Sequence, residues 1–158
     1  MSSPAAVAVA EESAVTGPRR RATSVDAAHV VTVHSPTEVT VRKLIAADEP
    51  YLEGHYPDFT VYPGAFIVES VCEAVLHLMR HTSGADAWAR PAAIRSVRFT
   101  SALAPGDTLE VHCVCRPEAA GVLAVEARCT NGGTKAALIK MTFRTTADAD
   151  DLPGGPDA

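Results

Sequence analysis

Alternation of apolar and polar residues predicts six β-strands in two groups along the chain. A period of two places one face of each strand against a core. The predicted strands are 29–35, 38–46, 92–103, 107–118, 121–133 and 134–146. Turn sequences rich in Pro, Gly and Asn lie between most of them. We expect the first two strands to form a hairpin and the last four to form a meander.

One α-helix is predicted between the two groups of strands, over residues 65–82. Its apolar residues recur with helical spacing, Pro63–Gly64 come directly before it, and Ser83–Gly84 follow it. The preceding segment, 47–64, holds three prolines and two glycines and is expected to be a long structured loop. These elements predict an α+β fold, with one antiparallel sheet and one long helix packed on it.

The length and composition fit one folded domain with a tail at each end. The chain has 158 residues, of which 47% are hydrophobic, and this is enough apolar material for one core. Residues 1–24 and 147–158 lack periodicity and are rich in small residues and proline. We expect these tails to be disordered and the domain to span residues 25–146.

Charge and hydropathy exclude two classes of partner. The net charge is −5 and the longest basic run is Arg19–Arg21, which argues against nucleic-acid binding. The sequence holds neither an apolar run of about 18 residues, as a membrane span needs, nor a basic start typical of secretory signals. We therefore expect a cytoplasmic protein whose cysteines are small buried hydrophobes. A zinc site at His112, Cys113 and Cys115 would lack the usual ligand spacing.

Two residues near the predicted helix are candidates for acid–base chemistry. His55 lies in the loop, and Glu69 lies in the helix on a polar stripe. Taken alone, His55 can be a loop histidine bonded to backbone, and Glu69 can be the edge of a solvated stripe. Glu69 borders the apolar side, where partial burial would raise its pKa. Glu73, His77 and His81 have a spacing that could hold a metal, but no fourth ligand is evident, so we expect none.

Residues 54–69 resemble the signature of the hotdog-fold 3-hydroxyacyl-acyl-carrier-protein dehydratases of bacterial fatty-acid and polyketide synthesis. The sequence reads Gly54–His55–Tyr56–Pro57, then DFTVYPG, then AFIVE ending at Glu69, with the family's spacing from histidine to acid. VRFTSALAPGDTLEV, at 97–111, is similar to a strand–turn–strand segment of the family. Tyr56 replaces the family's phenylalanine, and the opening segment of the housekeeping enzymes is missing. These departures favour a specialised pathway.

The resemblance implies a hotdog fold, in which one antiparallel sheet wraps around a long central helix. It also implies dehydration of a (3R)-hydroxyacyl thioester to a trans-2-enoyl thioester. In that reaction His55 would take the C2 proton and Glu69 would protonate the departing hydroxyl. The Gly64 N–H, at the helix N-terminus, would bind the thioester oxygen, with Pro63 and Tyr56 beside it. The resemblance further implies a dimer in which His55 of one protomer faces Glu69 of the other.

Acyl carrier proteins are the partners that the resemblance implies. Their phosphopantetheine carries the substrate, so no bound cofactor is expected. Carrier proteins are acidic, and Arg80, Arg95 and Arg98 are candidates for docking them, although these arginines can also be ordinary surface charge. The dimer would be a homodimer or a pair with a second hotdog chain. Two alternative functions are a hotdog acyl-thioesterase and a non-catalytic subunit of a heterodimeric dehydratase.

Overall fold

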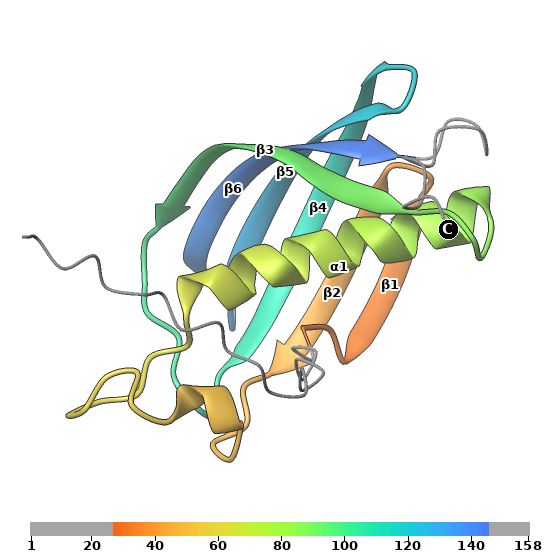
Figure 1. The fold of residues 1–158 in the computed structure, drawn as a ribbon. Helices are drawn as coiled ribbons and strands as arrows, with labels where there is room; N and C mark the ends of the chain where they lie inside the picture. Colours follow the sequence, from red (N-terminus) through yellow and green to blue (C-terminus); the bar gives the residue numbers. More distant parts are fainter. Residues whose placement is uncertain (1–26, 146–158) are drawn as a thin grey trace, which may run out of the picture.

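The computed structural model of the protein describes residues 27–145, which form a six-stranded antiparallel sheet crossed by one long helix (Figure 1). The strands are β1 (Val30–Ser35), β2 (Glu38–Leu44), β3 (Ala89–Phe99), β4 (Thr108–Ala119), β5 (Val122–Asn131) and β6 (Thr134–Thr145). The helices are α1 (Gly64–Ser83) and the short 3-10 helix η1 (Pro50–Leu52). The predicted strands and long helix are all found, with ends that differ by a few residues. The predicted tails, 1–24 and 147–158, lie outside the described residues.

The order of strands in the sheet is β1-β2-β4-β5-β6-β3, with antiparallel neighbours throughout. β4, β5 and β6 form a meander, but the expectation that β3 would pair with β4 was wrong. β3 pairs with β6 at the far edge, and β4 lies beside β2 instead. Residues 100–107 form a connection too long for a tight hairpin, and it crosses from one edge of the sheet to the middle.

The core lies between the sheet and α1, around which the sheet curves (Figure 1). Alternate residues of the strands point inward, so that Val41 of β2 lies opposite Val111 of β4 and both are buried. Val71 and Val75 of α1 are buried in the same cluster. Ser70 falls on the predicted polar side of α1 but is also buried. Its hydroxyl donates to the Phe66 carbonyl (3.0 Å), so it is satisfied without a hydrogen bond to water.

The four cysteines are free thiols, and three of them lie buried on the inner face of the sheet. Burial raises the pKa of Cys115 and of Cys129 to about 12, so these thiols stay protonated and unreactive at neutral pH. The expectation that the cysteines are buried hydrophobes is confirmed for Cys113, Cys115 and Cys129. Within residues 27–145, no helix has the length and apolar character that a membrane crossing requires.

Candidate active site

His55 lies half-buried in the loop between η1 and α1, and its ring is held by the backbone. Its Nδ1 is 2.7 Å from the Val61 carbonyl oxygen. A carbonyl only accepts hydrogen bonds, so Nδ1 carries the proton and Nε2 of the neutral ring keeps a free lone pair. A loop histidine bonded to backbone and a histidine that acts as a base are therefore compatible here, because the hydrogen bond to the Val61 carbonyl selects the tautomer that can act as a base.

Two main-chain hydrogen bonds hold the backbone of His55 as well. Its N–H donates to the Leu52 carbonyl at 3.2 Å, and its carbonyl accepts from the Val61 N–H at 2.8 Å. The peptide bond between His55 and Tyr56 is cis. The rings of these two residues lie 4.5 Å apart, and the Tyr56 N–H donates to the Phe59 carbonyl at 2.7 Å. These hydrogen bonds close the loop into a turn that holds His55 in place.

Gly64 is the first residue of α1, and Pro63 precedes it in an extended conformation. Within residues 27–145 no side chain caps this end of the helix, so its first N–H groups stay available to a ligand. The aromatic ring of Phe99 lies over Gly64, and a Cβ on Gly64 would come within 2.5 Å of Phe99 Cζ. A larger residue at this position would require the half-exposed Phe99 ring to move. The positive end of the helix dipole lies here, as an oxyanion site requires.

A cavity of about 500 Å³ brings most of these groups together. His55, Tyr56 and Gly64, which are three of the predicted site residues, line it. The remaining lining residues are Val61, Tyr62, Ile67, Phe99, Thr100, Ser101, Ala102 and Leu103. Residues 99–103 were predicted only as the end of a strand and as part of a family-like segment, and not as residues of the site. They reach the cavity because the crossover from β3 to β4 passes the N-terminus of α1.

Glu69 is exposed on α1 and lies outside the set of described residues that line the cavity. The single chain therefore does not bring Glu69 to the cavity of its own His55. The partial burial expected for Glu69 is also not found, because its side of α1 faces away from the sheet. Glu69 and Glu73 both lie near Cys72, and the pKa of this thiol is raised to about 11, first by burial and then by the two carboxylates.

The three candidate docking arginines are all exposed, and two of them line different grooves. Arg80 lies near the C-terminal end of α1 and lines a groove together with valines of β1. Arg95 lines a different groove, where its Nε donates to Thr142 Oγ1 at 3.1 Å. Arg98 lies on β3 next to Phe99, so it is the candidate that adjoins the cavity lining in sequence.

Two of the candidate metal ligands on α1 lie close to each other. Glu73 Oε2 lies 3.7 Å from His77 Nε2, one turn further along the helix. Across residues 27–145, no group of three or more His, Cys, Asp or Glu side chains is arranged to hold a metal.

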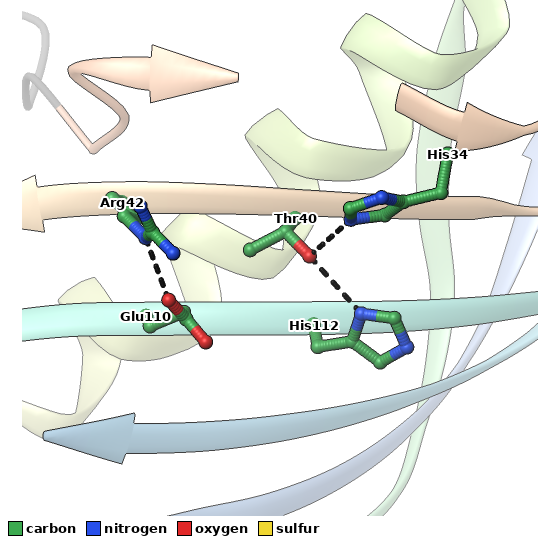
Figure 2. A network of polar contacts seen from close by, with 5 residues as sticks. All are labelled: His34, Thr40, Arg42, Glu110 and His112. Carbon is green, nitrogen blue, oxygen red and sulfur yellow. Dashed lines mark hydrogen bonds and ion pairs between the residues drawn. The ribbon is translucent and has the colours of Figure 1, made fainter. Parts of the chain in front are cut away.

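A second polar network lies on β1, β2 and β4, as Figure 2 shows. The Thr40 hydroxyl is 2.8 Å from His34 Nε2 and 3.0 Å from His112 Nδ1. The hydroxyl has one hydrogen, so it either donates to one imidazole and accepts from the other, or accepts from both. Beside it, Arg42 Nε and Glu110 Oε2 form an ion pair of 2.6 Å between β2 and β4. These contacts join neighbouring strands, and none of their residues lines the cavity beside His55.

Comparison with known proteins relates the chain to dehydratases. The family model described as "ApeI-like: ApeI dehydratase" matches residues 31–137. FabZ, the 3-hydroxyacyl-[acyl-carrier-protein] dehydratase of Nitratidesulfovibrio vulgaris (strain DP4), is 32% identical over 111 residues, which cover 68% of this chain and 72% of the relative. FabZ of Polynucleobacter asymbioticus is 31% identical over 105 residues, which cover 66% and 70%.

Solved structures share the architecture and confirm the hotdog fold. The dehydratase heterocomplex ApeI:P from Xenorhabdus doucetiae has a TM-score of 0.58 at 18% identity, covering 73% of this chain and 94% of that chain. A hypothetical thioesterase protein with coenzyme A from Streptococcus pneumoniae TIGR4 has a TM-score of 0.57 at 14% identity, covering 78% and 91%. Dehydratases and thioesterases thus share this fold, and the sequence similarity distinguishes them. The match over residues 31–137 covers more than half of the chain, so the chain belongs to the ApeI-like dehydratase family, and His55, Gly64 and Glu69 lie within the matched range.

Proposed function

We propose that the protein removes water from a (3R)-hydroxyacyl thioester, carried on the phosphopantetheine of an acyl carrier protein, to give the trans-2-enoyl thioester. Membership of a dehydratase family and the FabZ relatives support this reaction. The observation that carries the proposal is the bond from His55 Nδ1 to the Val61 carbonyl. It leaves Nε2 as a base in a residue that lines the same cavity as the N-terminus of α1.

The reaction needs a base, an acid and a site for negative charge. His55 Nε2 takes the C2 proton, and the electrons of that C–H bond form the C2=C3 double bond as the C3–O bond breaks. Glu69 gives its proton to the departing hydroxyl, which leaves as water. The Gly64 N–H binds the thioester oxygen, where negative charge grows in the transition state. Both transfers are proton transfers, so the mechanism uses no bound cofactor.

A dimer supplies the acid that the cavity of a single chain lacks. Within the described part of the chain, β3 has a strand neighbour on one side only. Two of its large apolar side chains are open to solvent, Ile94 by 57% and Phe99 by 50%. Pairing two copies along β3 would cover these side chains and bring a second α1 beside the cavity. In this arrangement His55 acts together with Glu69 of the partner subunit.

The proposal also covers the dimer partner, the docking of the carrier protein, the cellular location and the pathway. We favour a homodimer, and pairing with a second hotdog chain is the alternative, since ApeI:P is itself a heterocomplex. Arg98, which precedes the lining residue Phe99 in sequence, is the arginine we propose for docking the carrier protein, with Arg80 and Arg95 as weaker candidates. Free cysteines fit a reducing compartment, so we propose a cytoplasmic location. The departures from the housekeeping enzymes favour a polyketide or modified-lipid pathway.

Mass spectrometry of a 3-hydroxyacyl carrier protein incubated with the enzyme tests this function. Loss of one water, with the acyl group still attached to the carrier, is the expected result. Release of the free acid would identify a thioesterase instead. An unchanged substrate would identify a non-catalytic subunit, and adding the second hotdog chain of the same pathway would then restore dehydration only if the protein works as a heterodimer.

A further inference from the structure

A buried ion pair lies directly upstream of the loop that carries His55. Lys43 is in the inward-facing row of β2, between Val41 and Ile45, and is 1% exposed. Its Nζ lies 2.8 Å from Glu49 Oε1, and the Glu49 side chain is 12% exposed. A buried ion pair is often no more stabilising than apolar side chains of the same volume. Stability alone therefore does not account for a lysine in this apolar row.

Hydrogen bonds lead from this ion pair to His55. Glu49 Oε1 also accepts the Ala46 N–H at 3.3 Å. The Glu49 carbonyl accepts the Leu52 N–H at 3.0 Å, and the Leu52 carbonyl accepts the His55 N–H at 3.2 Å. Leu52 itself is buried in the core. An unbroken set of contacts thus runs from β2, through η1, to the backbone of the histidine.

The start of this loop is fixed separately. The Ile45 N–H donates to the Asp107 carbonyl at 2.9 Å, and the Ile45 carbonyl accepts the Gly106 N–H at 2.8 Å. Beyond Ile45 the chain leaves the sheet and does not rejoin a long element until α1 begins at Gly64. The ion pair between Lys43 and Glu49 therefore ties the first part of this loop to β2.

We propose that Lys43 and Glu49 are positioning residues for His55, because their ion pair fixes η1 against β2 and the last carbonyl of η1 holds the histidine backbone. This inference rests on the proposed function, in which His55 is the base. A proton transfer requires the base to lie within hydrogen-bond reach of the proton, so a small displacement of the loop slows the chemical step.

The ionisation of Glu49 agrees with a permanent anchor. Burial raises the pKa of Glu49, but hydrogen bonds to Lys43, Tyr51 and the Ala46 N–H, together with the charge of Lys43, outweigh burial. The pKa of Glu49 is therefore below its ordinary value, and the carboxylate is charged at neutral pH. The pair persists wherever the proposed reaction would run.

The test replaces both charges together, so that no unpaired charge is left in the core. Lys43→Met/Glu49→Met is the test variant, and Arg42→Met/Glu110→Met is the matched control. Arg42 is the neighbour of Lys43 in β2 but points to the other face, where it pairs with Glu110 in the open (Figure 2). Each double variant removes one positive charge from β2 together with the negative charge that pairs with it. Glu49→Gln, which keeps an oxygen for Lys43 and Ala46, serves as a milder second variant.

Two readouts are measured on all variants. The first is amide hydrogen exchange of Leu52 and His55 in the free protein, which does not depend on activity. The second is kcat and KM for dehydration, with and without deuterium at C2 of the substrate. We expect the test variant to melt close to the wild type, to exchange these amides at least tenfold faster and to lose at least tenfold in kcat. KM should change little, and the C2 isotope effect should rise because proton transfer becomes slower.

The outcomes separate this inference from the proposed function. Unchanged exchange at Leu52 and His55, or unchanged kcat in the test variant of an active enzyme, overturns the positioning role. A fall in kcat without a larger isotope effect also overturns it. If the wild type shows no dehydration, the proposed function is rejected. Faster amide exchange in the test variant would then still show that the ion pair anchors the loop. If the double variant does not fold, Glu49→Gln should show smaller changes of the same sign.

Discussion

The bond from His55 Nδ1 to the Val61 carbonyl decides which nitrogen of this histidine can act as a base. The sequence does not show which tautomer His55 adopts, because its hydrogen-bond partner is a main-chain atom six residues away. The structure supplies that partner and turns a residue chosen by resemblance into one with a defined protonation pattern. For Lys43 the sequence predicts the position of the side chain but not its partner. Its place in the apolar row follows from the alternation of β2, but its partner Glu49 lies in a loop without periodicity.

Replacing the base should abolish most of the dehydration without unfolding the protein. His55→Ala removes the only nitrogen assigned to take the C2 proton, so kcat should fall by about 10²–10⁴. The melting temperature should stay near that of the wild type, because His55 is a half-buried loop residue. Single-turnover dehydration and circular dichroism measure the two effects. A His55→Ala enzyme with wild-type turnover would remove His55 from the mechanism.

The ionisation of Glu49 should make the stability fall at acid pH. The folded state holds the pKa of Glu49 below its ordinary value, so the contribution of Glu49 is complete above an unfolded pKa of about 4.3. It is lost as the pH falls from there through the folded value. Urea unfolding between pH 7 and pH 3 should therefore show a steeper loss for the wild type than for Lys43→Met/Glu49→Met. Parallel curves for the two proteins would contradict the lowered pKa.

Among the elements of the fold, α1 does most to build the site. Its N-terminus provides the open N–H groups, its inner face packs on the sheet, and Glu69 stands on its outer face. Periodicity predicted this helix well, because its apolar spacing and its flanking Pro63 and Gly84 are local signals. The place of β3 was not predicted, since strand order depends on which inward-facing rows pair in space. That misplacement also hid the contribution of Phe99 to the cavity.

The contact between α1 and β3 can be tested at Gly64. Gly64→Ala places a methyl group within 2.5 Å of Phe99 Cζ, and because this half-exposed ring can move aside we expect a destabilisation at or below the lower end of the about 1–3 kcal/mol that overpacking costs in a closed core. In a Phe99→Ala background the same change should no longer destabilise, because alanine is the better helix former and the clash is gone. Denaturant unfolding of the four proteins of this double-mutant cycle gives the coupling energy. Equal effects of Gly64→Ala in both backgrounds would show that the two residues do not interact.

For the whole molecule, one chain holds only part of the proposed site. His55, Gly64 and Phe99 meet at one cavity, whereas Glu69 is exposed outside its described lining. Helical periodicity placed Glu69 at the border of the apolar side of α1, and it was the family resemblance, not this spacing, that predicted a site shared with a second copy. The exposed apolar side chains of β3, at the edge of the sheet, point to where that copy would bind.

Mixing two inactive variants tests this shared site most directly. His55→Ala and Glu69→Gln should each be nearly inactive alone, and Glu73→Gln, one turn along α1, is the control that should keep most activity. In a mixed dimer, His55 of the Glu69→Gln chain meets the intact Glu69 of the other chain, so one of the two sites is whole. After unfolding and refolding the two variants together, dehydration should return to about a quarter of the wild-type rate, as random pairing in a twofold dimer gives. No recovery in a mixture that contains mixed dimers would contradict the account.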